Sequence, residues 1–307
     1  MYSSEYYVPS HITGFFVPYF SDDCLKTGST GAGVTLSLGL NTKINVYNGN
    51  GKVKVKLNGK KMTPSTNPIS FKCLNIIKER YPKFITNKDV FIEQESDVPV
   101  GSGYGTSASA VLGICFSLKD LVNISVKDCI RIAHEAEVKN LSGLGDVVAE
   151  VKGGVEIRKT PGVEGIIENI PATGLKVLSV SLGIKKTGSV LGNQDKIKII
   201  EKCGTKLLKK LVNEPTVEKM MECSKKFTYK TGILSSEILD TSRRLIVTMA
   251  IATGISENQK YITEGPFPVA QTLLSGLTGK TSPEQAKAIN CCLVLCADHE
   301  LNASALA

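Results

Sequence analysis

Three glycines at alternate positions, followed at once by small side chains, restrict the fold of this chain more than any other feature. They are Gly101, Gly103 and Gly105, and a helix-like apolar run begins near Ser107. Glycine has no Cβ, so such a loop can adopt positive φ angles and approach a bulky ligand closely. The N–H groups and dipole at the start of the next helix favour an anion, most often phosphate. We therefore predict a phosphate-binding loop at a helix N-terminus.

This loop fits neither of the two common phosphate-binding motifs. Residues 99–110 contain no lysine, and their glycines are spaced by two throughout, unlike a P-loop or a dinucleotide fingerprint. A tight strand-to-helix turn is therefore the alternative to an ATP-phosphate cradle. The hydroxyls of Thr106 and Ser107 could bind phosphate or a metal ion, and helix N-capping is the alternative for Ser107. The residues assigned to the cradle are Pro99, Gly101, Ser102, Gly103, Tyr104, Gly105, Thr106, Ser107, Ala108 and Ser109.

Charge and composition argue against several classes of function. The net charge is +8, but the lysines are scattered, and those in 52–56 alternate with apolar residues as on a solvated strand face. We therefore expect no nucleic-acid partner, and the positive balance suits ATP and an anionic substrate. No apolar run approaches the ~20 residues of a membrane span, so we expect no membrane association.

The cysteines predict a reducing environment. There are nine, none in a C-x-x-C pair, and the N-terminus lacks a secretory pattern. We expect reduced, mostly buried thiols in a cytoplasmic protein. Cys291, Cys292 and Cys296 form a cluster, but they lie in an expected apolar helix and adjacent cysteines rarely face one metal, so we do not expect zinc.

The hydrophobic pattern predicts strands and then helices, twice. Ser125 and Asp128 resemble a capping box, and Gly204 is a weak point in an otherwise amphipathic helix. The order predicts an α+β protein of two domains. The expected strands are 34–40, 44–46, 52–57, 90–92 and 177–182, with a hairpin turn at 48–51 and another turn at 58–59. The expected helices are 71–81, 107–122, 126–140, 197–212 and 217–227.

The loop and two further segments carry a resemblance to a known family. Pro-x-x-x-Gly-x-Gly-Thr-Ser-Ala, from Pro99 to Ala108, resembles the second motif of the GHMP small-molecule kinases, such as galactokinase, homoserine kinase and mevalonate kinase. Residues 9–34, and 142–149 with the following Gly-Gly, resemble archaeal pantoate kinases within that superfamily. The resemblance covers roughly residues 1–240.

The resemblance implies a fold and a reaction. The fold would comprise a ribosomal-protein-S5-like ATP-binding domain over 1–155 and a ferredoxin-like domain over 156–240, the latter truncated if the remaining tail is foreign. The reaction would move the γ-phosphoryl group of ATP, with Mg²⁺, to a hydroxyl of pantoate, giving 4-phosphopantoate for coenzyme A synthesis. Another GHMP kinase, of homoserine or mevalonate type, is the alternative within the class. A homodimer is one arrangement that the sequence allows.

The resemblance also implies roles for individual residues. Ser107 matches a serine that binds Mg²⁺, with Glu137 as the second ligand and Glu135 in reserve. Asp146 resembles the base of mevalonate-type enzymes but stands one residue further from its glycine, and helix N-capping is its alternative. His11 falls in the motif that lines the acceptor site. The remaining substrate residues are Ser29, Thr30 and Gly31, with a turn as the alternative.

The last part of the chain, 241–307, resembles citrate synthase. Residues 277–285 and 293–304 carry the similarity, and His299 would match a histidine that binds oxaloacetate. A helix is expected from Ser282 to about Cys296. The sequence ends before that family's second histidine and aspartate, and the third GHMP motif, expected near residue 250, is not found. Two explanations of the tail remain: either pieces of two genes are joined at 235–250, or the tail is a kinase helix that resembles citrate synthase by coincidence. A chimeric chain with impaired kinase activity is a further alternative for the function.

Overall fold

The computed structural model describes residues 1–82, 87–172, 175–179, 193–233 and 296–298. The chain divides into one unit of Met1–Ile170 with Lys186–Thr231, and a second of Pro171–Lys185 with Gly232–Ala307. In the second unit, the described regular structure is an antiparallel pair of β8 (Lys176–Leu178) and β9 (Cys296–Asp298). The candidate site lies in the first unit, which the following paragraphs describe.

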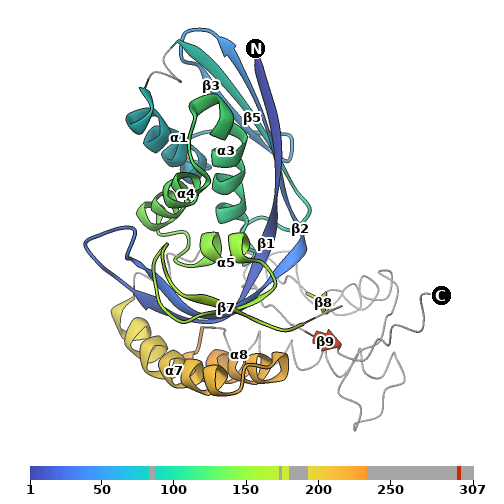
Figure 1. Ribbon diagram of the computed structural model, residues 1–307, viewed down its shortest axis with the longest axis vertical. Helices are drawn as coiled ribbons and strands as arrows, with labels where there is room; N and C mark the ends of the chain where they lie inside the picture. The colour runs from blue at the N-terminus through green and yellow to red at the C-terminus, as the bar shows by residue number, and fades with distance from the viewer. Residues whose placement is uncertain (83–86, 173–174, 180–192, 234–295, 299–307) are drawn as a thin grey trace, which may run out of the picture. The chain divides into compact units, whose positions relative to one another are not determined.

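A seven-stranded sheet is the framework of the first unit (Figure 1). Its two longest strands, β1 (Tyr2–Tyr19) and β2 (Gly28–Asn48), pair antiparallel along their length. The second half of β2 also pairs with β5 (Lys88–Ser96), and its first half with β6 (Val155–Arg158). The other strands are β3 (Val53–Leu57), β4 (Lys60–Met62) and β7 (Ile167–Ile170). Residue 155 is the expected end of the first domain, but β6 starts there and belongs to this sheet, so the sheet continues past that residue.

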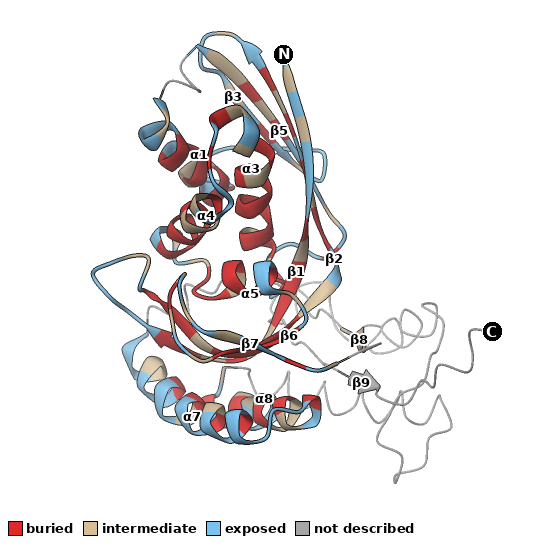
Figure 2. Ribbon diagram, viewed as in Figure 1, coloured by how far each residue is buried: buried red, intermediate tan, exposed pale blue. Residues whose placement is uncertain are grey.

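Helices cover the sheet and bury its apolar side chains. The core gathers Ile44 of β2, Ile92 of β5, Leu112 and Ile132, each at most 1% exposed. Figure 2 shows this buried layer between the helices and the strands. Burial of each such side chain contributes about 1.5–3 kcal/mol. The helices of this unit are α1 (Pro68–Arg80), α3 (Thr106–Val122), α4 (Val126–Asn140), α5 (Asp146–Lys152), α7 (Gln194–Asn213) and α8 (Val217–Thr231).

The expected helices of the first unit are confirmed, but one strand pairing is wrong. The sequence predicts a hairpin over 48–51, whereas β5 lies between β2 and β3 and pairs parallel with β3. The turn itself exists, because Asp89 Oδ1 accepts hydrogen bonds from the N–H groups of Asn50 and Lys52, both at 2.9 Å. Alternating hydrophobicity identifies a strand without selecting its neighbour.

Gly204 proves to be a close-packing position within a continuous α7. A Cβ there would lie 2.6 Å from Val17 Cγ2 and 2.9 Å from the Phe16 carbonyl oxygen of β1. The glycine therefore lets α7 approach β1 rather than interrupting the helix.

Several expectations for the tail fall outside the described residues. These are the third GHMP motif near 250, the helix from Ser282, and the side chains of Cys291, Cys292 and His299. Cys296, the expected end of that helix, lies in strand β9 instead. Among the helices that the structure describes, none is long and apolar enough to cross a membrane. Six cysteines are free thiols: Cys73, Cys115, Cys129 and Cys223 are buried, and Cys24 and Cys203 are partly exposed.

Candidate active site

The glycine loop (residues 99–105) leads directly into α3, as expected. Gly101, Gly103 and Gly105 have φ angles of 78°, 86° and 64°, in the left-handed region that favours glycine. Gly105 is the N-cap of α3 and no side chain caps the helix, so the capping alternative for Ser107 is wrong. The His11 N–H donates to the Tyr104 carbonyl at 3.1 Å, which ties the loop to β1. The start of α3 thus offers backbone donors toward an anion.

Glu137 of α4 is buried beside Ser107. The Ser142 hydroxyl donates to Glu137 Oε1 at 2.8 Å, and Ser107 is also hydrogen-bonded to this carboxyl group. The pKa of Glu137 is raised to about 7, first by burial and then by the negative charge of Asp146, against the lowering effect of the two serines. Glu137 Oε2 is buried and has no hydrogen-bond partner in the described part of the chain.

Glu135, the reserve metal ligand, has other partners. It forms ion pairs with Arg80 of α1 and with Lys139, the latter at 2.6 Å. Residues two apart on a helix face different directions. The structure therefore brings Glu137, and not Glu135, together with Ser107.

Asp146 begins α5 and contacts β1. His11 Nδ1 lies 2.9 Å from Asp146 Oδ1, and the Thr13 hydroxyl donates to the same oxygen at 3.2 Å. The N-cap of α5 is Gly145, with no side-chain capping bond, so the capping alternative for Asp146 is also wrong. Burial alone would raise the pKa of Asp146, but the hydrogen bond and charge of His11, with the Arg158 charge and Thr13, lower it overall.

His11 is fully buried between two carboxylates. Its Nε2 lies 3.0 Å from Glu156 Oε1 on β6, and Glu156 Oε1 also accepts from Arg158 Nη1. Burial by itself lowers the pKa of His11, yet the hydrogen bonds and charges of Asp146 and Glu156 raise it overall. Both ring nitrogens are occupied, so His11 would affect an acceptor through Asp146 rather than through a free nitrogen.

Ser29 and Arg158 border the space beside Gly145. A Cβ at Gly145 would lie 2.5 Å from Ser29 Oγ and 2.8 Å from Arg158 Nε. Arg158 Nε is buried without a hydrogen-bond partner among the described residues. Thr30 and Gly31 follow in β2, where they pair with Val17 and Phe16 of β1. In the described part of the chain, no side-chain hydrogen bond or ion pair joins Thr30 to Asp146 or Arg158.

Four polar residues of this region are not in the prediction from sequence. Their signal is weak: Glu156 and Arg158 alternate with apolar residues in the fully buried strand β6, and buried charges are usually paired. Ser109 Oγ donates to Glu150 Oε1 at 3.1 Å, and burial raises the pKa of Glu150 well above its usual value. The four residues are Thr13, Glu150, Glu156 and Arg158.

The residues around Ser107 fit Mg²⁺. A Cβ at Gly143 would lie 2.3 Å from Glu137 Oε2 and 3.0 Å from Asp146 Oδ2, so both oxygens border a space that only glycine leaves open. A buried carboxylate oxygen without a partner and a serine hydroxyl are donors that a hard cation prefers. No group of three or more His, Cys, Asp or Glu side chains positioned for a metal occurs among the described residues.

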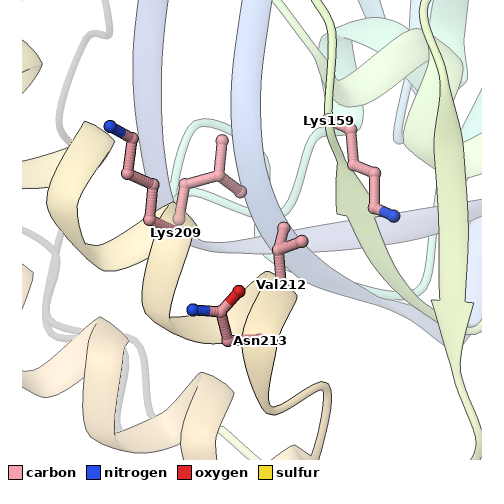
Figure 3. A pocket seen from close by; sticks show the side chains of 5 residues that line it. Lys159, Lys209, Val212 and Asn213 are labelled. Carbon is pink, nitrogen blue, oxygen red and sulfur yellow. The ribbon is translucent and has the colours of Figure 1, made fainter.

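A separate pocket lies between the end of β6 and α7. It has a volume of about 390 Å³ and is lined by Lys159, Leu208, Lys209, Val212 and Asn213 (Figure 3). Lys159 Nζ is paired with Glu168 Oε2 at 2.5 Å, and the ammonium groups of Lys159 and Lys209 point away from each other. Because its polar groups do not converge, the cluster around Asp146 is the better candidate for chemistry.

Comparisons with solved structures define the class of fold. The chain is similar to a "Phosphotransferase related to CoA biosynthesis pathway", with a TM-score of 0.75 and 29% identity over 98% of this chain and 100% of that one. It also shares a fold with mevalonate diphosphate decarboxylase from Staphylococcus aureus, with a TM-score of 0.59 and 14% identity over 96% and 95% of the two chains. The model of the GHMP kinases N terminal domain matches residues 69–154. The expected α+β GHMP-kinase fold is thus confirmed.

Curated relatives define the particular family. Pantoate kinase from Thermococcus kodakarensis is 37% identical over 243 residues, 78% of this chain and 79% of the relative. Pantoate kinase from Methanocaldococcus jannaschii is 34% identical over 256 residues, 83% of this chain and 90% of the relative. The chain therefore belongs to the pantoate kinase family, a group of ATP-dependent phosphotransferases.

The C-terminal part matches a second family. The model of the citrate synthase C-terminal domain matches residues 209–307. Since the M. jannaschii relative aligns with 83% of the chain, the kinase and citrate synthase matches overlap. Residues 209–231, in α7 and α8, belong to the first unit with the kinase sheet. The similarity to citrate synthase therefore begins within helices of that unit.

Proposed function

We propose that this protein transfers the γ-phosphoryl group of ATP to a hydroxyl group of pantoate, with Mg²⁺ as cofactor. One observation carries the proposal: Asp146, held by His11 and Thr13, lies beside Glu137 and the start of α3. Phosphoryl transfer needs a phosphate cradle, charge neutralisation and a group that orients the attacking hydroxyl. The names of the curated relatives support pantoate as the acceptor, as does the phosphotransferase of coenzyme A synthesis among the similar structures.

The glycine loop and α3 would hold the triphosphate of ATP. Backbone N–H groups of residues 101–107 and the α3 dipole would provide the attraction, since the N–H groups of Ala108 and Ser109 already donate to the Gly105 carbonyl. Ser107 and Glu137 would hold Mg²⁺, which when bound neutralises charge on the phosphates. One similar structure is described as "MDDEF in complex with MVAPP, AMPPCP and Magnesium", and its likeness of 16% identity supports the fold alone.

Asp146 would orient the hydroxyl group of the acceptor. Its lowered pKa keeps the carboxylate ionised at neutral pH, so it can accept a hydrogen bond from a hydroxyl group. A strong base is not needed, because the transition state of phosphoryl transfer is loose and positioning dominates catalysis. We assign Asp146 this orienting role. Its carboxylate would accept the proton of the hydroxyl group after the new bond between that oxygen and the phosphorus has formed.

Arg158 and Ser29 would bind the carboxylate of pantoate. Arg158 is 1% exposed and its Nε has no hydrogen-bond partner among the described residues. Guanidinium groups suit carboxylates because their geometries match. Thr30 and Gly31, the neighbours of Ser29, would line the same subsite.

We also propose the cytoplasmic location, the archaeal source and the domain boundaries at residues 155 and 240 that are expected from the sequence.

Turnover with competing acceptors tests the proposal. The full chain is incubated with Mg²⁺ and ATP plus pantoate, homoserine or mevalonate, and ADP and phosphorylated product are measured. We expect kcat/KM for pantoate to exceed the other values by about 100-fold or more. All three acceptors carry a carboxylate, but they differ in the groups between it and the hydroxyl, and a misplaced hydroxyl or a mismatched polar group lowers kcat/KM. Omission of Mg²⁺ should abolish turnover. Preference for another acceptor, or no turnover with any of them, would contradict the proposal.

A further inference from the structure

A row of side chains, buried except at its Asp146 end, crosses three strands behind the candidate site. We call Asp146, His11, Glu156 and Arg158 the buried charge line. His11 on β1, Glu156 and Arg158 are each at most 1% exposed, and Asp146 is the member nearest solvent, with its side chain 22% exposed. Successive members are within hydrogen-bond distance of one another. The line therefore connects the interior of the sheet to the carboxylate proposed to orient the acceptor.

Hydrogen bonding in the line defines the state of the His11 ring. A carboxyl oxygen lies within hydrogen-bond distance of each ring nitrogen, and a carboxylate can only accept hydrogen bonds, so this arrangement suits a ring in which both nitrogens donate. With His11 in the imidazolium form, the charges of the four groups alternate in sign from Asp146 to Arg158, and their sum is zero. A buried charge without such compensation is strongly destabilising. Glu156 is the member that contacts both positively charged groups, His11 and Arg158.

A glycine in β2 gives His11 room to reach Glu156. β2 lies between β1 and β6, and Gly33 pairs with Glu156 on one side and Thr13 on the other. A Cβ at Gly33 would lie 2.3 Å from His11 Nε2 and 2.6 Å from its Cε1. The imidazole therefore lies across β2 over Gly33, and its position depends on the absence of a side chain there.

The line determines which oxygen of Asp146 faces the site. Asp146 Oδ1 accepts hydrogen bonds from His11 and Thr13, whereas Oδ2 borders the space beside Gly143 and Glu137. Without a donor at His11 Nδ1, this division between the two oxygens would be lost. Glu150 is a further carboxyl group of this region: its Oε1 and the His11 Cβ both lie close to the position that a Cβ at Gly105 would take, and burial raises its pKa.

We propose that Glu156 is a positioning residue, which acts through a doubly protonated His11 to hold Asp146 Oδ2 toward the acceptor hydroxyl. The inference rests on the proposed function for its kinetic consequence, but not for the state of the ring. Glu156→Gln removes the charge and keeps the shape. Without that charge, His11 Nε2 loses its proton at neutral pH and the ring becomes an ordinary neutral imidazole.

The state of the ring can be observed directly. The chain has three histidines, His11, His134 and His299, so ring ¹H–¹⁵N correlation spectra of the labelled full chain are simple, and His11→Gln assigns the signals. At about pH 8 we expect protons on both ring nitrogens of His11 in the wild type and on one in Glu156→Gln. A wild-type ring with a single proton overturns the proposal, even if the variant does not fold.

Kinetics of the same variant test the effect on catalysis. We expect kcat with pantoate to fall about 10- to 100-fold, the usual loss when a supporting group no longer orients a functional side chain, while KM for ATP changes by less than about twofold. The matched control is Glu168→Gln on β7, whose side chain is 54% exposed and pairs with Lys159. An unchanged kcat in Glu156→Gln contradicts the proposal. Absence of turnover in the wild type would contradict the proposed function alone, because the ring spectrum still decides this inference.

Discussion

The glycine loop and the buried charge line meet at His11 but use opposite physical means. The loop relies on backbone: glycines with positive φ and a helix start without a side-chain cap. The line relies on side chains, with alternating charges away from water. A loop of this kind tolerates side-chain changes but not a Cβ at its glycines, whereas the line tolerates no unbalanced loss of charge. Substitutions can therefore distinguish the two.

Replacement of Asp146 should have the largest effect, because this residue belongs to the line and faces the space beside the loop. Asp146→Asn keeps the size but removes the charge that orients the acceptor. We expect kcat to fall about 10²–10⁴-fold while ATP affinity changes little. Steady-state kinetics and ATP titration of one preparation measure both. Near-normal turnover would remove Asp146 from the reaction.

Ser107→Ala tests the loop side with a smaller loss. The hydroxyl would touch Mg²⁺, and loss of one such contact lowers kcat about 10²–10³-fold, by analogy with removal of one oxyanion-hole donor. The fold should persist, since Ser107 is not the N-cap of α3. The thermal midpoint and kcat at saturating Mg²⁺ are the measurements. Wild-type turnover at saturating Mg²⁺ would show that the serine is not a ligand.

How much of each region could be predicted follows from this contrast. The loop is contiguous in sequence, so its glycines and Ser107 can be recognised without a structure. The line joins residues 135 and 145 positions apart, on β1, α5 and β6, and no local pattern links them. Resemblance alone places His11 in the acceptor motif, and its burial between two carboxylates depends on strand order. Strand order is also where the predicted β2–β3 hairpin failed.

Glu137 and Glu135 show the same limit on a smaller scale. Order along the family motif favours Glu137 over Glu135, but the hydrophobic pattern of α4 gives no independent distinction between them. The distinction comes from α1, whose Arg80 pairs with Glu135 and leaves Glu137 beside Ser107. Packing between helices distant in sequence thus separates the two glutamates.

Glu150 should give the loop a pH-dependent support that the charge line does not provide. Burial raises the pKa of Glu150, so folding favours the protonated form of this carboxyl group. The stability that Glu150 contributes is therefore complete below about pH 4.5 and is lost as the pH rises toward the folded-state pKa. Glu150→Gln stays neutral at every pH and can still accept from Ser109. As the pH rises from about 5 to about 8, we expect the free energy of unfolding to fall less in the variant than in the wild type. Thermal unfolding across that range measures it, and parallel curves would mean that Glu150 is ionised in the folded protein.

The smallest effect is expected at Glu135, next to the loop's proposed metal ligand. Its partners Arg80 and Lys139 are 42% and 49% exposed, and pairs with such exposed members contribute little because water screens them. Glu135→Gln should therefore change the free energy of unfolding by about 1 kcal/mol or less. The Mg²⁺ dependence of turnover should stay at the wild-type value, whereas Glu137→Gln should weaken it strongly. Measuring the Mg²⁺ concentration for half-maximal rate in both variants tests the assignment on α4. A weakened Mg²⁺ response in Glu135→Gln, with Glu137→Gln unaffected, would move the metal site to the other face of α4 and separate it from the glycine loop.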